Sequence, residues 1–186
     1  GKTYLAACLF THFAKVSTCL GRPLDSGPEF KFSVNASANL WDGFESHHWG
    51  IFIDELGPLK PEAANGVDPS LETILQVINA APYLPDQARL EDKGKKQCRP
   101  EFVVATSNSE DLNAHAYFQH PLAVQRRFQH IIVPRPKPEF ARERADGLLM
   151  LDSSKLSSSP GYSNYWDFVV KRVEPGPLLQ RKRQTA

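Results

Sequence analysis

The sequence has 186 residues, of which 41% are hydrophobic and 23% charged, and its formal net charge is +1 at pH 7. These values are typical of an ordinary globular chain that is long enough for one main domain with a sizeable core. A charge so close to zero excludes a general electrostatic attraction to nucleic acid, so any basic surface must be local.

The cysteines and the hydropathy of the sequence narrow the class of protein further. Cys8, Cys19 and Cys98 are odd in number and lack the spacing of paired metal ligands, which argues against a disulfide framework or a zinc site and is typical of a reducing compartment. The sequence has no apolar run of about 18 residues, and its first residues lack the charged-then-apolar pattern of a signal peptide. We therefore expect neither a membrane-spanning helix nor a leader within it.

The first predicted element is a helix that begins directly after Gly1-Lys2-Thr3 and ends at Gly21. A period near 3.6 residues predicts it. The residues that should face the core are Leu5, Cys8, Leu9, Phe13 and Val16. A helix that starts at Lys-Thr suits a phosphate site, because its first N–H groups and its dipole attract anions.

Two strands should follow. Residues 30–35 alternate Phe30, Phe32 and Val34 with polar residues, which predicts a strand with one buried face. After residues 38–48, expected as a short helix or a loop, the apolar run 49–56 predicts a buried parallel strand that ends in acids.

The middle of the chain should contain a second helix and a third strand. Asp68 is a good N-cap with Pro69 at the first helical position, and Pro82 should end the helix. Its apolar face would consist of Leu71, Ile74, Leu75 and Ile78. A polar stretch then leads to a buried strand over 102–106.

The last elements are a short helix over 121–127 and a strand over 128–135. This alternation of strands and helices predicts an α/β fold with a parallel, helix-covered sheet. Beyond about Asp152 we expect a Ser-rich linker, an edge strand or short helix over 165–173, and a basic, frayed tail over 180–186.

Polar side chains follow two of the predicted strands, and open parallel sheets bind ligands at that edge. Asp54 and Glu55 could hold a Mg²⁺ shell and orient the attacking water in nucleotide hydrolysis, although a solvated acidic pair at a strand end is the ordinary alternative. Asn108, after the next strand, could donate to a γ-phosphate or hold the water with Glu55, or it could form a turn.

Two basic features complete the set of candidates. Arg126 and Arg127 are adjacent on a predicted helix and should point about 100° apart, so that one could reach a neighbouring subunit's nucleotide while the other stays within its own subunit. A solvated pair is the alternative. A loop with four basic residues could contact a sugar-phosphate backbone or simply be solvated. These residues are Lys93, Lys95, Lys96 and Arg99.

Taken together, the motifs resemble those of the superfamily-three helicases of picorna-like positive-strand RNA viruses. The resemblance covers residues 1–135 and rests on the order of "GKT", "WDGF", "IFIDELG", "PYLPDQARLEDKG", "VVATSN" and "HPLAVQRRF". "WDG" before the acidic strand and Pro-x-x-Ala-x-Leu-x-x-Lys-Gly after it are not general features of nucleotide-binding folds.

The resemblance implies an AAA+-like P-loop NTPase with ATP and Mg²⁺ between the subunits of a ring, expected to be a hexamer. Gly1, Lys2 and Thr3 would end the Walker A loop, with Lys2 on the β/γ-phosphates and Thr3 on Mg²⁺. Asp54 and Glu55 would be the Walker B pair.

The remaining candidate residues match further motifs of the family. Asn108 matches its polar sensor, and Arg126 and Arg127 match the pair that contains its arginine finger. Lys93 and Gly94 match the family's motif near the central channel, which favours single-stranded RNA as a ligand of the basic loop.

This resemblance also implies a biological setting. We expect an RNA-remodelling ATPase of genome replication, acting with other viral replication proteins at membrane-associated complexes in the host cytoplasm. We expect residues 1–150 to form the ATPase core and 151–186 a linker and C-terminal extension.

The sequence departs from the family pattern in three ways. It begins inside the P-loop, so the first core strand is missing and a piece of a polyprotein is expected. The cysteine-rich zinc element of some members is absent, and membrane association would depend on an amphipathic helix upstream. Two alternatives stay open: a cellular AAA+ loader ATPase, since "GKTYLA" also occurs there, and a non-catalytic RNA-binding or scaffold fragment.

Overall fold

A computed structural model describes residues 2–35, 40–59, 66–156 and 164–173. The chain divides into two compact units, residues 1–127 and 128–186. The extent of the ATPase core, expected over 1–150, stays a prediction. The helices of the first unit are α1 (Lys2–Cys19), η1 (Pro28–Phe30), α2 (Pro69–Val77), η2 (Leu90–Asp92), α3 (Ala114–Tyr117) and α4 (Leu122–Gln125). Its strands are β1 (Lys31–Val34), β2 (Gly50–Ile53) and β3 (Phe102–Ala105).

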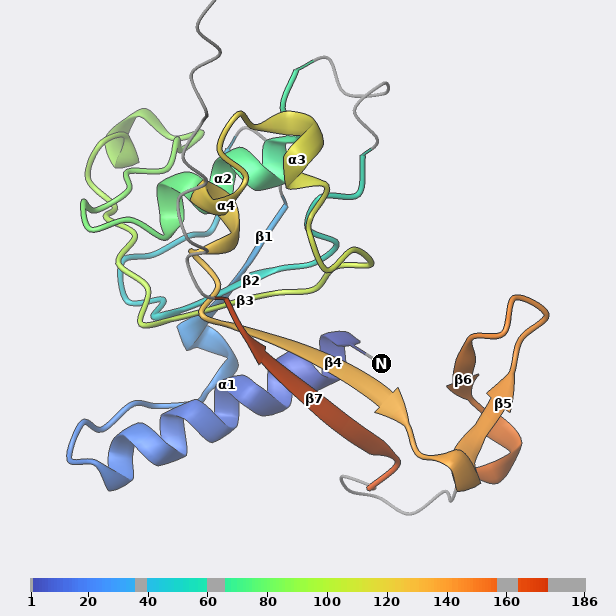
Figure 1. Cartoon of the computed structure of the whole chain (residues 1–186). Coiled ribbons are helices and arrows are strands. Elements are labelled where there is room, and N and C mark those ends of the chain that lie inside the picture. The colour runs from blue at the N-terminus through green and yellow to red at the C-terminus, as the bar shows by residue number, and fades with distance from the viewer. Residues whose placement is uncertain (1, 36–39, 60–65, 157–163, 174–186) are drawn as a thin grey trace, which may run out of the picture. The chain divides into compact units, whose positions relative to one another are not determined.

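The centre of the first unit is a three-stranded sheet in the order β1-β2-β3, with both pairs parallel. Helix α1 lies on one face of this sheet, and α2 and α4 lie on the other (Figure 1). All four residues of β2 are buried, as expected for the central strand of a covered sheet. These features confirm the predicted α/β class, the three strands and their parallel arrangement.

The packing of α1 differs from the prediction. Its buried residues are Ala6, Phe10, Ala14 and Ser17. Of the predicted face, Phe13 packs against the core, whereas Leu5, Cys8, Leu9 and Val16 are only partly covered or exposed. The small side chains let the helix lie close to the sheet, where the Phe10 ring stacks on Trp49 at 4.2 Å between centroids. Periodicity of large apolar residues therefore pointed to the wrong stripe.

Helix α2 begins as predicted and ends sooner. Asp68 caps it by accepting from the Ser70 N–H at 2.9 Å, and Pro69 occupies the first turn. The helix ends at Val77 rather than continuing to Pro82. One reason is that the Asn79 side chain accepts from the Ala80 N–H at 2.8 Å, a local bond that competes with helical pairing.

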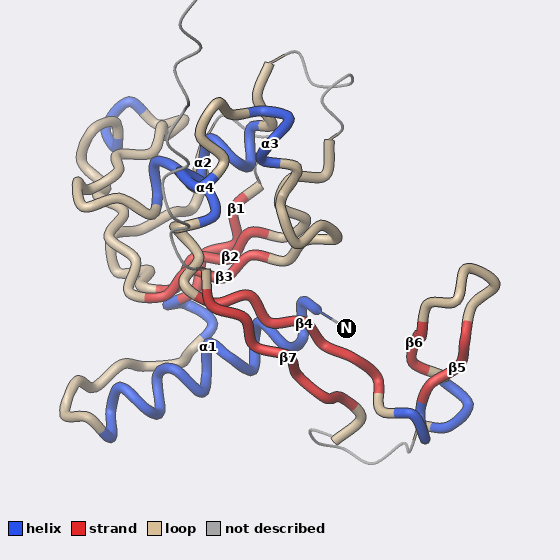
Figure 2. Tube along the Cα trace, viewed as in Figure 1, coloured by secondary structure: helices blue, strands red, loops and turns tan. Residues whose placement is uncertain are grey.

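Long loops make up much of the first unit (Figure 2). Residues 40–48 form a loop, one of the two predicted possibilities, and residues 36–39 lie outside the described part. The short helix expected near 121–127 is α4, whereas α3 was not predicted.

The second unit contains β4 (His130–Pro136), η3 (Pro138–Phe140), β5 (Ala141–Glu143), β6 (Leu149–Leu151), η4 (Ser153–Lys155) and β7 (Trp166–Arg172). Strand β4 pairs antiparallel with β7, so the prediction that it completes the parallel sheet is wrong. Pro134 and Pro136 lack N–H donors and suit a strand with one paired edge. β7 confirms the strand alternative for 165–173, while the expected tail over 180–186 lies outside the described residues.

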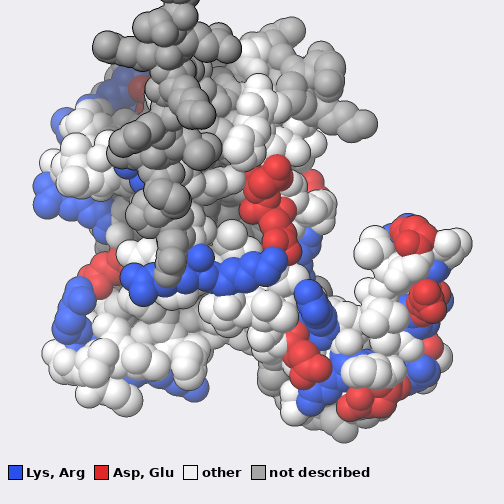
Figure 3. Space-filling model, viewed as in Figure 1, with Lys and Arg blue, Asp and Glu red and all other residues white. Residues whose placement is uncertain are grey.

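Basic and acidic side chains are mixed on the face of the molecule that Figure 3 shows. This mixture is consistent with the net charge of +1. Within residues 2–35, 40–59, 66–156 and 164–173, no helix combines the length and apolar character that crossing a bilayer requires.

Candidate functional site

The candidate site forms where the parallel strands end. β2 ends at Ile53 and β3 at Ala105, so Asp54 and Thr106 leave the sheet at the same edge. The first turn of α1 meets them there. We use the name strand-end cluster for the side chains of Lys2, Thr3, Asp54, Glu55, Thr106 and Asn108. Gly1 lies outside the described residues.

Lys2 contacts the segment after β3. Its Nζ donates to the Ser107 carbonyl at 2.9 Å and to Asn108 Oδ1. These bonds join residues more than a hundred positions apart in the sequence. The structure thus brings together the lysine and the asparagine that sequence analysis assigned to the same site.

Thr3 contacts the acidic residue after β2. Its Oγ1 donates to Asp54 Oδ2 at 3.4 Å, and both side chains are exposed. Hydroxyl and carboxylate oxygens are the hard donors that Mg²⁺ prefers, usually together with substrate phosphates. The donor set fits that ion, and Thr3 and Asp54 are the residues that would hold it.

Glu55 has an unusual backbone. Its φ of 56° lies in the left-handed region, which is uncommon for a residue other than glycine. Its N–H donates to Thr106 Oγ1 at 3.1 Å, while the residue itself is exposed. The turn therefore presents an exposed carboxylate beside Asp54 at the edge where the other cluster residues lie.

Thr106 is a member of the cluster that sequence reasoning missed. It is only 8% exposed, and its Oγ1 donates to Asp54 Oδ1. The available signal was its position as the first polar residue after the apolar run of β3. That position alone did not separate it from Ser107 and Asn108, which follow it.

Arg126 and Arg127 lie elsewhere in the first unit. Both line an open pocket of about 690 Å³ together with Arg99, the end of α2 and the start of β3. No lining residue belongs to the strand-end cluster. The two arginines are therefore not part of that cluster within one chain.

The two arginines differ in their bonding. Arg126 is exposed. Arg127 is partly buried, and its Nη1 donates to the Ala123 carbonyl of α4. Its Nε is buried and has no hydrogen-bond partner among the described residues. Arg127 therefore bonds within its own chain, and a role of either arginine toward a second subunit stays a prediction.

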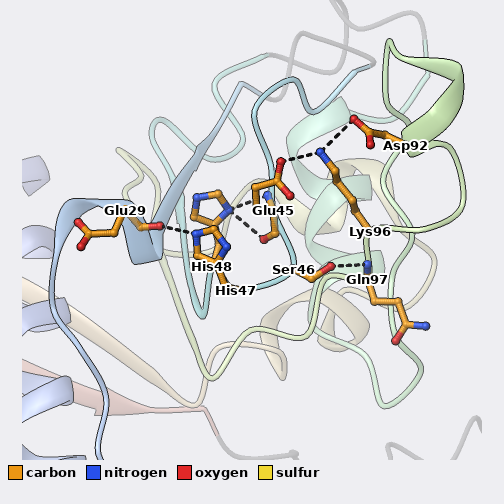
Figure 4. Close-up of polar contacts among 8 residues, drawn as sticks. All are labelled: Glu29, Glu45, Ser46, His47, His48, Asp92, Lys96 and Gln97. Carbon is orange, nitrogen blue, oxygen red and sulfur yellow. Dashed lines mark hydrogen bonds and ion pairs between the residues drawn. The ribbon is translucent and has the colours of Figure 1, made fainter.

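The basic segment is anchored through one of its four candidate residues. Lys96 Nζ lies 2.7 Å from Glu45 Oε1 and 3.0 Å from Asp92 Oδ2, and these bonds raise the pKa of Lys96 (Figure 4). In contrast, Lys93, Lys95 and Arg99 are exposed. The contacts of Lys96 give it a structural role that the sequence did not reveal.

The two segments that are specific to the resembled family pack against each other. The Trp41 N–H donates to the Asp86 carbonyl at 2.9 Å, and the Trp41 ring meets the Tyr83 ring edge-on at 5.5 Å. The Gln97 N–H donates to Ser46 Oγ at 3.1 Å (Figure 4). "WDGF" and the Lys-Gly stretch thus form one structural unit.

The adjacent histidines form hydrogen bonds with backbone groups. His47 Nε2 donates to the Glu29 carbonyl at 3.0 Å, and His48 Nδ1 accepts from the Glu45 N–H at 2.8 Å (Figure 4). The same Nδ1 also lies 2.9 Å from the Glu45 carbonyl, and burial lowers the pKa of His48. Both rings support the loop that contains Glu45.

Comparison with known proteins gives two matches. A family model described as RNA helicase matches residues 1–109, more than half of the 186-residue chain. The genome polyprotein of Human parechovirus 5 is 26% identical over 125 residues, which is 67% of this chain. The chain spans about 5% of that polyprotein's length.

The family match covers all three strands of the parallel sheet and every member of the strand-end cluster. It ends just past Asn108, before Arg126 and Arg127. By this match, with the parallel α/β fold in support, the chain belongs to the RNA helicase family.

Proposed function

We propose that the strand-end cluster binds and hydrolyses ATP with Mg²⁺, as part of an RNA helicase of an RNA virus. The observation that carries this proposal is the pair of contacts from the first turn of α1, Lys2 to Asn108 and Thr3 to Asp54. A cation, two oxygen donors for Mg²⁺ and a polar amide then share one edge of a parallel sheet. Phosphoryl transfer depends on such positioning and charge stabilisation.

Five of the six cluster residues have a direct role in this proposal. Lys2 pairs with the β/γ-phosphates, and its exposed Nζ can exchange Asn108 for a phosphate oxygen. Thr3 and Asp54 hold Mg²⁺. Glu55 and Asn108 position the attacking water, with Glu55 as its base.

RNA would bind at the basic segment through Lys93, Lys95 and Arg99, which are exposed. Contacts of this kind depend on phosphate charge rather than on base sequence. Lys96 holds the segment in place through Glu45 and Asp92. In this proposal the RNA is single-stranded.

The arginine pair supports a role for subunit assembly in ATP hydrolysis. Arg126 is exposed and has no carboxylate within ion-pair distance in the described part of the chain, so it can reach a nucleotide held by a second copy. We assign the trans-acting role to Arg126. The assembly would be a ring of identical subunits, expected to be a hexamer. The polyprotein relative supports a location in an infected host cell, and replication with other viral proteins at host membranes is the setting that we propose.

The test is nucleotide turnover by a protein that extends upstream of Gly1 with a complete glycine-rich loop. Lys2→Ala and Asp54→Ala should each abolish ATP hydrolysis, because each removes a charge that the transition state needs. Lys15→Ala is the matched control, since Lys15 is exposed on the same helix. Substantial hydrolysis by either cluster variant would overturn the proposal, and RNA binding without any turnover by the unsubstituted protein would favour a non-catalytic role.

A further inference from the structure

Thr106 forms hydrogen bonds with four consecutive residues, the last residue of β2 and the three residues that follow it. Its N–H donates to the Ile53 carbonyl at 2.9 Å, and its carbonyl accepts from the Leu56 N–H at 2.6 Å. Its side-chain Oγ1 accepts from the Glu55 N–H at 3.1 Å and donates to Asp54 Oδ1. Thr106, the residue directly after β3, therefore constrains the backbone at residues 53–56 and the side chain of Asp54.

The direction of the two hydroxyl bonds is fixed by their chemistry. A backbone N–H can only donate, so the Glu55 N–H uses a lone pair of Thr106 Oγ1. The single hydroxyl proton is then available for Asp54 Oδ1, and a carboxylate accepts such a bond strongly. With Oδ1 held, Oδ2 is the oxygen that lies 3.4 Å from Thr3 Oγ1.

The same hydroxyl supports the left-handed backbone of Glu55. This conformation is unfavourable for a residue with a side chain, so the surrounding bonds must offset its cost. The bonds to Thr106 from the Glu55 and Leu56 N–H groups constrain the turn on both sides of the strained φ.

We propose that Thr106 is a positioning residue of the nucleotide site. Through its hydroxyl it orients the Asp54 carboxylate toward Mg²⁺ and holds Glu55 in the backbone conformation that presents its carboxylate. This inference rests on the proposed function of the strand-end cluster. It adds a residue that touches neither nucleotide nor metal and acts through Asp54 and Glu55.

The test compares two substitutions that separate the hydroxyl from the rest of the residue. Thr106→Val has nearly the same shape and retains both backbone bonds, so it removes only the bonds to Asp54 and Glu55. Thr106→Ser retains the hydroxyl and removes a methyl group. The matched control is Thr73→Val on α2, which removes a hydroxyl that donates to the Pro69 carbonyl at 2.9 Å.

The principal readout is the Mg²⁺ concentration that gives half-maximal binding of a fluorescent, non-hydrolysable ATP analogue. Loss of an outer-shell partner typically costs about 10- to 100-fold in metal affinity or activity. Thr106→Val should raise that Mg²⁺ concentration by a factor in this range and lower kcat. Thr106→Ser should restore both toward the unsubstituted protein, and Thr73→Val should change neither.

Two results would overturn the inference. One is an unchanged Mg²⁺ dependence and kcat in Thr106→Val, and the other is an equal defect in Thr106→Ser. If Thr106→Val lowers the melting temperature below the assay temperature, Thr106→Ala against Thr106→Ser makes the same comparison. Turnover that survives Lys2→Ala and Asp54→Ala refutes the proposed function, whereas turnover that depends on them but ignores the Thr106 hydroxyl refutes only this inference.

Discussion

Gly50 lies in β2 against the Phe10 ring of α1, at the closest approach between helix and sheet. A Cβ at this position would lie 2.4 Å from Phe10 Cε2 and 2.7 Å from Cδ2. The ring cannot move away freely, because it also stacks on Trp49 and meets Phe52 edge-on. Glycine is therefore required here by packing rather than by backbone conformation.

Gly50→Ala should lower the free energy of unfolding by about 1–3 kcal/mol, the usual cost of overpacking a close-packed core. Equilibrium unfolding in urea measures this change. Ser33→Ala on the exposed side of β1 is the control and should stay close to the unsubstituted protein. An equal stability of the two variants would mean that α1 and the sheet separate easily.

Cys98 is a buried thiol, and burial raises its pKa to about 12. The thiolate is the reactive form, so Cys98 should react slowly with a disulfide reagent at pH 8, while the exposed Cys19 reacts fast. Counting labelled cysteines by mass spectrometry over time checks this order. Fast labelling of Cys98 in the native protein would contradict its burial.

The same thiol gives a pH dependence of stability. Its pKa in the folded chain lies above the value of about 8.5 in an unfolded chain. The stabilisation is therefore complete below about pH 8.5 and is lost as pH rises toward the folded value. The difference in unfolding free energy between the unsubstituted protein and Cys98→Ala should shrink over this range, and a constant difference would refute the shift.

At the scale of elements, local signals predicted where helices begin better than which face they bury. Asp68 and Pro69 start α2 as expected, because capping depends on neighbouring residues in the chain. The buried stripe of α1 was mispredicted, since it depends on what lies opposite. Its small buried residues allow a close contact with β2. The sequence of α1 alone cannot show this contact, because β2 lies elsewhere in the chain.

Lys95 and Lys96 are neighbours in the basic segment, yet the structure gives them different surroundings. Lys95→Ala should weaken binding of a single-stranded RNA oligonucleotide and reduce the slope of log K against log[salt] by about 0.7, the value for one phosphate contact. Its melting temperature should not change, because Lys95 is exposed.

Lys96→Met should show the opposite result. It removes the ion pairs to Glu45 and Asp92 and should lower the melting temperature, with a smaller effect at high salt because screening weakens such pairs. Fluorescence anisotropy and thermal unfolding, measured on both variants, separate the two roles. Matching changes in both variants would show that the segment acts as one solvated loop.

At the scale of the whole molecule, the proposed assembly makes Arg126 and Arg127 testable by subunit mixing. Arg126→Ala should lose most ATP turnover, since an arginine that acts in trans contributes about 10³–10⁵-fold in related phosphoryl transfer. Mixing it with Asp54→Ala subunits should recover part of the activity, because some interfaces then combine an intact Arg126 with an intact Asp54.

Arg127→Ala should behave differently. It removes a bond to the Ala123 carbonyl of α4, so it should lower stability, and mixing should not complement it. Turnover is measured at concentrations where the oligomer forms, checked by sedimentation. An absence of recovery with Arg126→Ala under those conditions would exclude that residue as the trans-acting group.

The sequence by itself determined the order of the main elements, the parallel class of the sheet and the family. It also placed Lys2, Thr3, Asp54, Glu55 and Asn108 at strand or helix ends. These conclusions depend on local patterns: apolar runs, caps and short motifs that a stretch of chain contains on its own. The same patterns could not show which of these side chains touch.

Only the tertiary structure decided the buried face of α1, the partner of β4 and the contacts of Thr106 and Lys96. Each depends on residues far apart in the chain: Phe10 on Gly50, β4 on β7, Thr106 on Asp54, and Lys96 on Glu45. Such contacts are set by which surfaces meet after folding, and propensity or periodicity within one segment contains no information about the opposite surface.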